Sequence, residues 1–159
     1  MLNLEKNFFK KRILIYGLGK SGLSAYSFLK KRNIISLFDD RIIAKKKIKN
    51  NNTTYKEIIK KEFDCIIISP GIDINKCKLS RFLKKNHEKI YTDLDIFYSQ
   101  YAFNQKITIT GTNGKSTTAK LLHDILKDQK KDVRLVGNIG NPILLEKKIK
   151  KDTLFVIEA

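Results

Sequence analysis

The sequence has no tryptophan, one methionine, two prolines and two cysteines among 159 residues. Cys65 and Cys77 form no C-x-x-C pair and have no cluster of other ligand residues nearby, which argues against a zinc site and a disulfide framework. No apolar run approaches the roughly 20 residues of a membrane-spanning helix. The N-terminus lacks a signal peptide's apolar segment and cleavage site. We therefore expect a cytoplasmic protein that does not insert into a membrane.

Acidic residues are also scarce, with 16 against 33 basic residues and a net charge of +17. This balance raises the possibility of nucleic-acid binding. However, only five basic residues are arginine, aromatic residues are not interleaved with the basic runs, and no nucleic-acid-binding motif is present. We expect the lysine runs 45–47 and 147–148 to be solvated surface rather than nucleic-acid contacts. A basic surface still attracts anionic substrates such as nucleotides.

A glycine-rich loop separates a predicted strand from a predicted helix in the last third of the chain. The β-branched residues 107–110 indicate a buried strand, and residues 117–127 carry apolar side chains at helical spacing. The loop between them, 111–116, reads Gly-Thr-Asn-Gly-Lys-Ser. This arrangement is typical of a phosphate-binding P-loop. Lys115 would contact the outer phosphates, and the Ser116 hydroxyl would bind Mg²⁺.

The loop is shorter than the general P-loop pattern, because Ile109 stands where that pattern has its first glycine. The alternative is an ordinary strand-to-helix turn with a capping serine. Farther along, the apolar strand 153–157 ends at Glu158, whose carboxylate would lie near the Mg²⁺. The alternative for Glu158 is a glutamate that faces solvent.

A second glycine loop, 17–22, has the complete pattern G-x-G-x-x-G. It follows a predicted strand, 12–16, and precedes a predicted helix, 23–31, and a second strand, 34–38. The acidic pair at 39–40 comes about 20 positions after the glycines, where a ribose or base contact is expected. The pattern predicts a pyrophosphate at the helix N-terminus. It leaves open whether the ligand is NAD or a UDP-sugar.

The fold class that these patterns predict is α/β. A third buried strand, 63–69, stops at Ser69-Pro70-Gly71, which is either a ligand-binding edge or a plain loop. We expect a Rossmann-like parallel-sheet domain over residues 1–104 and the start of a P-loop-type α/β ATPase domain over 105–159. Because three strands would leave sheet edges uncovered, we expect an N-terminal fragment of a longer enzyme.

Together these motifs resemble the Mur ligase family, in the branch that adds D-glutamate to UDP-N-acetylmuramoyl-L-alanine. The matching segments are GLGKSG (17–22), FDDR (38–41), SPGI (69–72), TDLDIF (92–97), TGTNGKST (110–117), GNIGNP (137–142) and VIEA (156–159). The resemblance implies an ATP-dependent amide ligase that acts through an acyl phosphate in peptidoglycan precursor synthesis, and so serves the cell wall, cell shape and cell division. It implies ATP and Mg²⁺ as cofactors, D-glutamate and the UDP-sugar as substrates, and a monomer.

The resemblance also implies site residues. Those for the UDP-sugar would be Gly17, Gly19, Lys20, Ser21, Gly22, Asp39, Asp40, Arg41, Ser69, Gly71 and Asn138. Those for ATP would be Gly111, Thr112, Asn113, Gly114, Lys115, Ser116 and Thr117. Lys115 and Glu158 would serve catalysis, and Ser116 and Glu158 would bind the metal.

The same resemblance places further metal ligands and the D-glutamate site beyond Glu158, so we expect no ligation by these 159 residues alone. The alternative function is an NAD(P)-binding oxidoreductase module. It would explain the loop 17–22 and the acidic pair 39–40, but not the loop 111–116.

Overall fold

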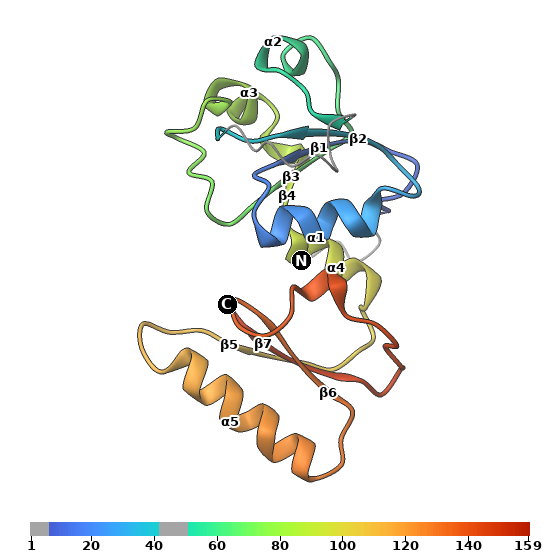
Figure 1. The fold of residues 1–159 in the computed structure, drawn as a ribbon, viewed down its shortest axis with the longest axis vertical. Helices are drawn as coiled ribbons and strands as arrows, with labels where there is room; N and C mark the ends of the chain where they lie inside the picture. Colours follow the sequence, from blue (N-terminus) through green and yellow to red (C-terminus); the bar gives the residue numbers. More distant parts are fainter. Residues whose placement is uncertain (1–6, 42–50) are drawn as a thin grey trace. The chain divides into compact units, whose positions relative to one another are not determined.

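The computed structural model describes residues 7–41 and 51–159. The contacts divide the chain into two compact units, Met1–Ser99 and Gln100–Ala159, and each unit has its own parallel sheet (Figure 1). The boundary predicted from the sequence lay at residue 104. The lysine run 45–47 lies outside the described residues. The predicted α/β class, with parallel strands, is confirmed.

The first unit contains a four-stranded parallel sheet with strand order β2-β1-β3-β4. Its strands are β1 (Arg12–Tyr16), β2 (Ile34–Phe38), β3 (Cys65–Ile68) and β4 (Ile90–Tyr91). Its helices are α1 (Lys20–Leu29), α2 (Tyr55–Ile58), α3 (Ser80–Lys85), the 3-10 turn η2 (His87–Lys89) and α4 (Asp93–Gln100). Helices α2 and α3 cover one face of the sheet, and α1 lies on the other (Figure 1).

Strand β1 is the centre of this unit. Ile13, Leu14, Ile15 and Tyr16 are all fully buried, because helices cover both faces of the sheet. Its last residue, Tyr16, is in register with Phe38 of β2 and Ile68 of β3. The loops that follow these three strands therefore leave the sheet at one edge.

The second unit contains a three-stranded parallel sheet with strand order β5-β7-β6. Its elements are β5 (Lys106–Ile109), α5 (Lys115–Asp128), β6 (Val133–Gly137), the 3-10 turn η3 (Ile143–Leu145) and β7 (Leu154–Glu158). Its small core joins Ala119 of α5 to Val133 of β6 and Val156 of β7, with Leu122 and Leu126 packed against it.

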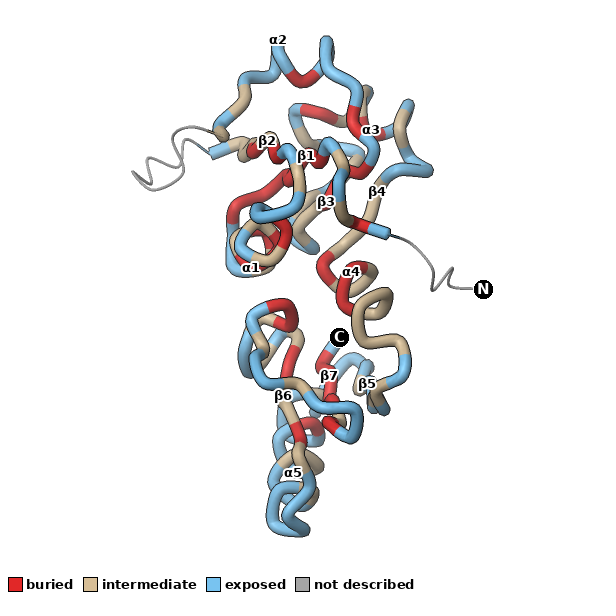
Figure 2. The backbone as a smooth tube through the Cα atoms, turned by 90° about the vertical axis from the view of Figure 1, so that its right-hand side faces the viewer, coloured by how far each residue is buried: buried red, intermediate tan, exposed pale blue. Residues whose placement is uncertain are grey.

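The burial prediction for β5 is wrong in part, and the apolar residues of α5 are only partly covered. Strand β5 was expected to be buried, but Ile107 is 38% exposed, because β5 pairs only with β7 among the described strands. In α5, Leu122 and Leu126 pack on the core, whereas Leu121 and Ile125 are 60% and 46% exposed. A three-stranded sheet covers only part of this helix, and Figure 2 shows α5 as mostly exposed.

Helix α1 begins three residues earlier than predicted, at Lys20 rather than at residue 23. The reason is that Gly19 keeps an extended conformation and the chain turns directly into the helix after it. In the described ranges, no helix is both long and apolar enough to cross a bilayer.

Candidate functional site

The first glycine loop is tied to the end of β3 by contacts that only glycine permits. A Cβ added at Gly22 would lie 1.8 Å from the carbonyl oxygen of Gly17. A Cβ added at Gly17 would lie 2.9 Å from the Cβ of Ser69, whose hydroxyl donates a 2.8 Å hydrogen bond to the Gly17 carbonyl. The structure thus brings together three of the residues predicted to bind the UDP-sugar, namely Gly17, Gly22 and Ser69. It gives Ser69 a structural contact with the loop.

The N-terminus of α1 is open to an anion. Gly19, which precedes the helix, makes no side-chain cap, and the first turn contains no acidic residue. A Cβ added at Gly19 would meet nothing within 4 Å. The first backbone N–H groups of a helix need acceptors and lie at the positive end of its dipole. Gly19 and the exposed Lys20 therefore border a suitable position for a phosphate.

Asp39 fixes the glycine loop to the end of β2. Its carboxylate accepts a 2.6 Å hydrogen bond from the Leu18 N–H and a 2.9 Å bond from the Arg41 N–H. Both carboxylate oxygens of Asp39 are therefore engaged by the protein itself. Arg41 and Gly71 are exposed residues at this edge of the sheet, where they are accessible to a ligand.

Asp40 is bonded to groups that the sequence did not point to. Its carboxylate accepts a 2.7 Å hydrogen bond from the hydroxyl of Tyr16, and its carbonyl accepts a 2.8 Å bond from Lys78 Nζ. Burial, together with the bond to Asp40, raises the pKa of Tyr16 above its ordinary value. The apolar pattern of β1 gave no signal that Tyr16 bonds this carboxylate, and no motif marks Lys78.

The second glycine loop leads into α5 without a side-chain cap. Gly114 precedes the helix with φ of +75°, and the first turn carries no acidic residue. The alternative predicted a capping serine, but the residue before the helix is Gly114 and no side chain caps it. Lys115 Nζ donates a 2.6 Å hydrogen bond to the Gly111 carbonyl, so this side chain folds back over its own loop. Thr112 and Asn113 of the loop and Thr117 of α5 are exposed.

Ser116 and Glu158 meet beside this loop. The Ser116 hydroxyl donates a 3.2 Å hydrogen bond to Glu158 Oε1, and Glu158 is 5% exposed, so the alternative of a solvent-facing glutamate is wrong. Glu158 Oε2 is buried and has no hydrogen-bond partner among the described residues. A buried carboxylate oxygen without a partner is unfavourable. A cation beside it would remove that cost.

The residues fit Mg²⁺ in its usual protein setting. Mg²⁺ is commonly held by one or two side-chain oxygens, with water and substrate phosphates completing the shell. Ser116 and Glu158 supply two such oxygens. In the described part of the chain, no group of three or more His, Cys, Asp or Glu residues could hold a metal. Because Ser116 and Glu158 supply two oxygens, the site is suited to a metal whose remaining ligands are water and substrate phosphates.

The loop after β6 is held against the end of β7. Gly137 has φ of +109°, and a Cβ added there would lie 2.2 Å from the Glu158 carbonyl oxygen. The Asn138 N–H donates a 3.0 Å hydrogen bond to the same carbonyl. The exposed Asn138 therefore lies beside Glu158, whose carboxylate contacts Ser116 of the P-loop.

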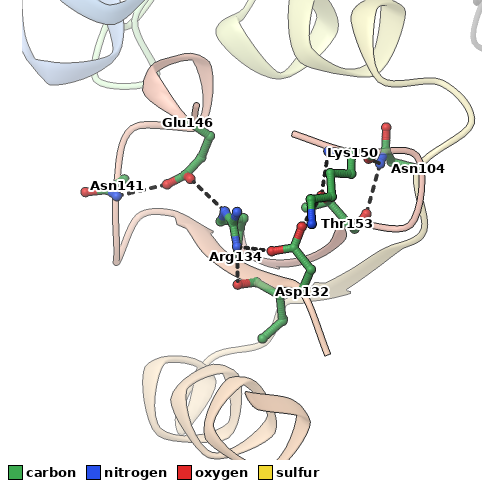
Figure 3. Close-up of polar contacts among 8 residues, drawn as sticks. Asn104, Asp132, Arg134, Asn141, Glu146, Lys150 and Thr153 are labelled. Carbon is green, nitrogen blue, oxygen red and sulfur yellow. Dashed lines mark hydrogen bonds and ion pairs between the residues drawn. The ribbon is translucent and has the colours of Figure 1, made fainter. Parts of the chain in front are cut away.

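A polar network fixes the other end of this loop (Figure 3). The Asn141 side chain donates a 2.9 Å hydrogen bond to Glu146 Oε1, and Arg134 Nε lies 3.3 Å from Glu146 Oε2. Arg134 also pairs with Asp132, which accepts a 2.6 Å bond from the Thr153 hydroxyl. The Thr153 bond, followed by Arg134, lowers the pKa of Asp132. No sequence motif marked these residues.

An open cavity of about 580 Å³ continues from the P-loop along α5. It is lined by Ser116, Thr117, Lys120, Leu121, Asp124, Leu135, Ile139 and Gly140. Its polar end contains the first residues of α5, and the rest of its wall is largely apolar.

Comparison with known proteins gives two matches to family descriptions. Residues 11–91 match "Mur ligase MurD-like, N-terminal domain", and residues 109–159 match "Mur ligase middle domain". A UDP-N-acetylmuramoylalanine–D-glutamate ligase from Wolbachia sp. subsp. Brugia malayi is 39% identical over 92% of this chain and 31% of its own length. The one from Caldicellulosiruptor bescii is 33% identical over 93% of this chain and 35% of its own length.

A solved structure has the same fold. It is the UDP-N-acetylmuramate:L-alanyl-gamma-D-glutamyl-meso-diaminopimelate ligase from Neisseria meningitides, with a TM-score of 0.56 and 15% identity. The similarity covers 94% of this chain and 52% of that chain. The chain spans about a third of the length of the curated relatives it matches. Because the two family descriptions together match most of its residues, the chain belongs to the Mur ligase family.

Proposed function

We propose that this chain supplies the UDP-sugar-binding and ATP-binding parts of a ligase that adds D-glutamate to UDP-N-acetylmuramoyl-L-alanine. Its relatives are named for this reaction. The observation that carries the proposal is the contact of Glu158 with both Ser116 and Asn138. Two substrates, ATP through its phosphates and the UDP-sugar, would meet at this residue.

The proposed chemistry begins with transfer of the ATP γ-phosphoryl group to the alanine carboxylate, which gives an acyl phosphate and ADP. The amine of D-glutamate then attacks the acyl carbon and releases phosphate. The backbone N–H groups before α5 would bind the phosphates, and the Lys115 ammonium would turn from Gly111 to the β and γ oxygens. When bound, Mg²⁺ would neutralise phosphate charge, held by Ser116 and Glu158.

In the first unit, the open N-terminus of α1 would bind the UDP diphosphate. Arg41 and Gly71 would line the uridine pocket, while Asp39 would shape the loop through its backbone bonds. Because ATP and UDP-sugars are cytoplasmic metabolites, we place the reaction in the cytoplasm. We also propose that the enzyme acts as a monomer.

The alternative, an NAD(P)-binding oxidoreductase module, has less support. The acidic residue at the ribose position, Asp39, already accepts backbone N–H groups with both oxygens. That reading also gives no role to the buried oxygen of Glu158.

The proposal can be tested with a chimera that joins residues 1–159 to the remaining length of the Wolbachia relative. We expect ADP release that requires both the UDP-sugar and D-glutamate. Lys115→Ala should lower the rate by at least about a hundredfold, because a charge that stabilises the transferring phosphoryl group is lost. Lys127→Ala, an exposed lysine about three turns further along α5, is the matched control. ADP release by a folded chimera that does not depend on the UDP-sugar, or that survives Lys115→Ala, would contradict the proposal.

A further inference from the structure

The loop 137–142, which follows β6, is fixed at both of its ends. At the first end, the Asn138 N–H donates a 3.0 Å hydrogen bond to the Glu158 carbonyl. At the second end, the Asn141 side chain donates a 2.9 Å bond to Glu146 Oε1 (Figure 3). The exposed Asn138 lies between these two attachments, so they set the position from which its side chain can reach a ligand.

The backbone of this loop does not hold its shape by conformational preference. Gly137 and Gly140 have φ of +109° and +77°, and a Cβ added at Gly140 would lie 2.1 Å from the Leu135 carbonyl oxygen. Glycine loses more conformational freedom on folding than any other residue. A loop with two such glycines therefore depends on the contacts at its ends to hold Asn138 in one place.

Glu146 is the more rigid of the two side chains at the second end. Its side chain is 7% exposed, and its Oε2 lies 3.3 Å from Nε of Arg134, a residue of β6. Arg134 is itself paired with Asp132. Both oxygens of Glu146 are thus engaged by the protein, so this carboxylate acts on the loop through Asn141.

We propose that Glu146 is a positioning residue for the sugar part of the UDP-sugar: by holding Asn141, it fixes the loop so that the Asn138 amide faces the ligand beside Glu158. A side-chain amide has both donors and an acceptor, which suits the hydroxyl and amide groups of an N-acetylated sugar. Glu146 itself does not touch the ligand. This inference rests on the proposed function, since it needs the UDP-sugar at Asn138.

The test is calorimetric titration of the chain with UDP-N-acetylmuramoyl-L-alanine and, in parallel, with UDP. Glu146→Ala should weaken binding of the UDP-sugar by about tenfold, the effect of losing one well-placed hydrogen bond. The affinity for UDP should not change, because UDP lacks the sugar that Asn138 would contact.

A double-mutant cycle separates positioning from a general loss of structure. Asn138→Ala should weaken UDP-sugar binding by at least about tenfold. Adding Glu146→Ala to Asn138→Ala should then weaken it by less than about twofold more, because Glu146 acts through Asn138. If Glu146→Ala does not fold, the exposed Asn141 replaces it in the cycle as Asn141→Ala, with the same expected results.

The matched control is Thr153→Val, at the far end of the same polar network. Thr153 is fully buried, donates a 2.6 Å bond to Asp132 and accepts a 2.8 Å bond from the Lys150 N–H. Valine keeps its shape and removes both bonds, so this variant should lose stability. It should bind the UDP-sugar like the wild type, because Thr153 precedes β7 whereas the loop follows the opposite end of β6.

Undiminished binding of the UDP-sugar by Glu146→Ala or by Asn138→Ala would overturn this inference and leave the proposed function standing. Losses that multiply in the cycle, or an equal loss in Thr153→Val, would do the same. Absence of UDP-sugar binding by the wild type would overturn the proposed function and the inference with it.

Discussion

At the scale of single residues, the buried carboxylates of Glu158 and Glu146 differ in whether both of their oxygens have bonding partners. Glu146, with a 7% exposed side chain, has both oxygens bonded, to Asn141 and Arg134. Glu158 has one oxygen bonded to Ser116 and the other without a partner in the described ranges. A paired buried carboxylate contributes to stability, and a partly unpaired one reduces it. The second arrangement is typical of a site prepared for a cation.

Glu158→Gln is therefore expected to raise the free energy of unfolding of the ligand-free protein by about 1 kcal/mol, because it removes a buried charge and keeps the shape. It should also remove any stabilisation by Mg²⁺ with ATP. The measurement is chemical unfolding with and without both ligands. Glu146→Gln is the control and should lower stability. A Glu158→Gln variant that is less stable than the wild type, yet still stabilised by Mg²⁺ and ATP, would refute this assignment.

The side-chain partners of Asp39 and Asp40 show what sequence reasoning misses at this scale. Their position after β2 was predicted from the spacing, and the structure places them at the expected edge of the sheet. Their bonds to Leu18 N–H and the Tyr16 hydroxyl join positions 21 and 24 residues apart. Such bonds depend on side-chain rotamers and on the twist of the sheet, which no pattern of residue types reports.

At the scale of elements, the two glycines that flank the start of α1 have different tasks. A Cβ at Gly22 would collide with the Gly17 carbonyl oxygen at 1.8 Å, whereas one at Gly19 would enter open space. Gly22 is therefore needed to pack the helix against the strand. Gly19 leaves room over the helix N-terminus.

We predict that Gly22→Ala destabilises the chain by about 3 kcal/mol, because a backbone carbonyl cannot move aside cheaply. Gly19→Ala should change stability by less than about 0.5 kcal/mol while weakening UDP-sugar binding at least tenfold. Thermal unfolding and ligand titration of the two variants measure both effects. Equal losses of stability in the two variants would show that Gly19 also serves packing.

The positions of strands and helices could be predicted where the residue pattern alone determines them. The burial of their side chains could not, because burial depends on the elements packed against them. The runs that became β1 and β7 were recognised because strands in parallel sheets with covered faces are continuously apolar. The run at β5, in which isoleucine alternates with threonine, was also expected to be buried, but it is partly exposed and has one partner strand in the described chain. Similarly, α5 was predicted from its spacing, but the width of the sheet beneath it decides which leucines are covered.

At the scale of the whole molecule, the same arrangement of strand, glycine loop and helix occurs in both units. Each unit has a parallel sheet whose first strand leads through a glycine loop into a helix without a side-chain cap. Each loop also has an acidic residue from the end of a neighbouring strand, Asp39 after β2 and Glu158 in β7. Asp39 accepts bonds from backbone N–H groups, whereas one oxygen of Glu158 has no partner within residues 7–41 and 51–159. This difference supports a diphosphate ligand in the first unit and a metal with phosphates in the second.

The measurement that tests this account most directly is a calorimetric titration of the chain with UDP-N-acetylmuramoyl-L-alanine and, in parallel, with NAD⁺. The account predicts heat of binding with the UDP-sugar, a loss of at least tenfold in affinity on Arg41→Ala, and no binding of NAD⁺. Arg32→Ala, an exposed arginine beyond the end of α1, should bind like the wild type. Binding of NAD⁺ without binding of the UDP-sugar would contradict the account and favour the oxidoreductase alternative.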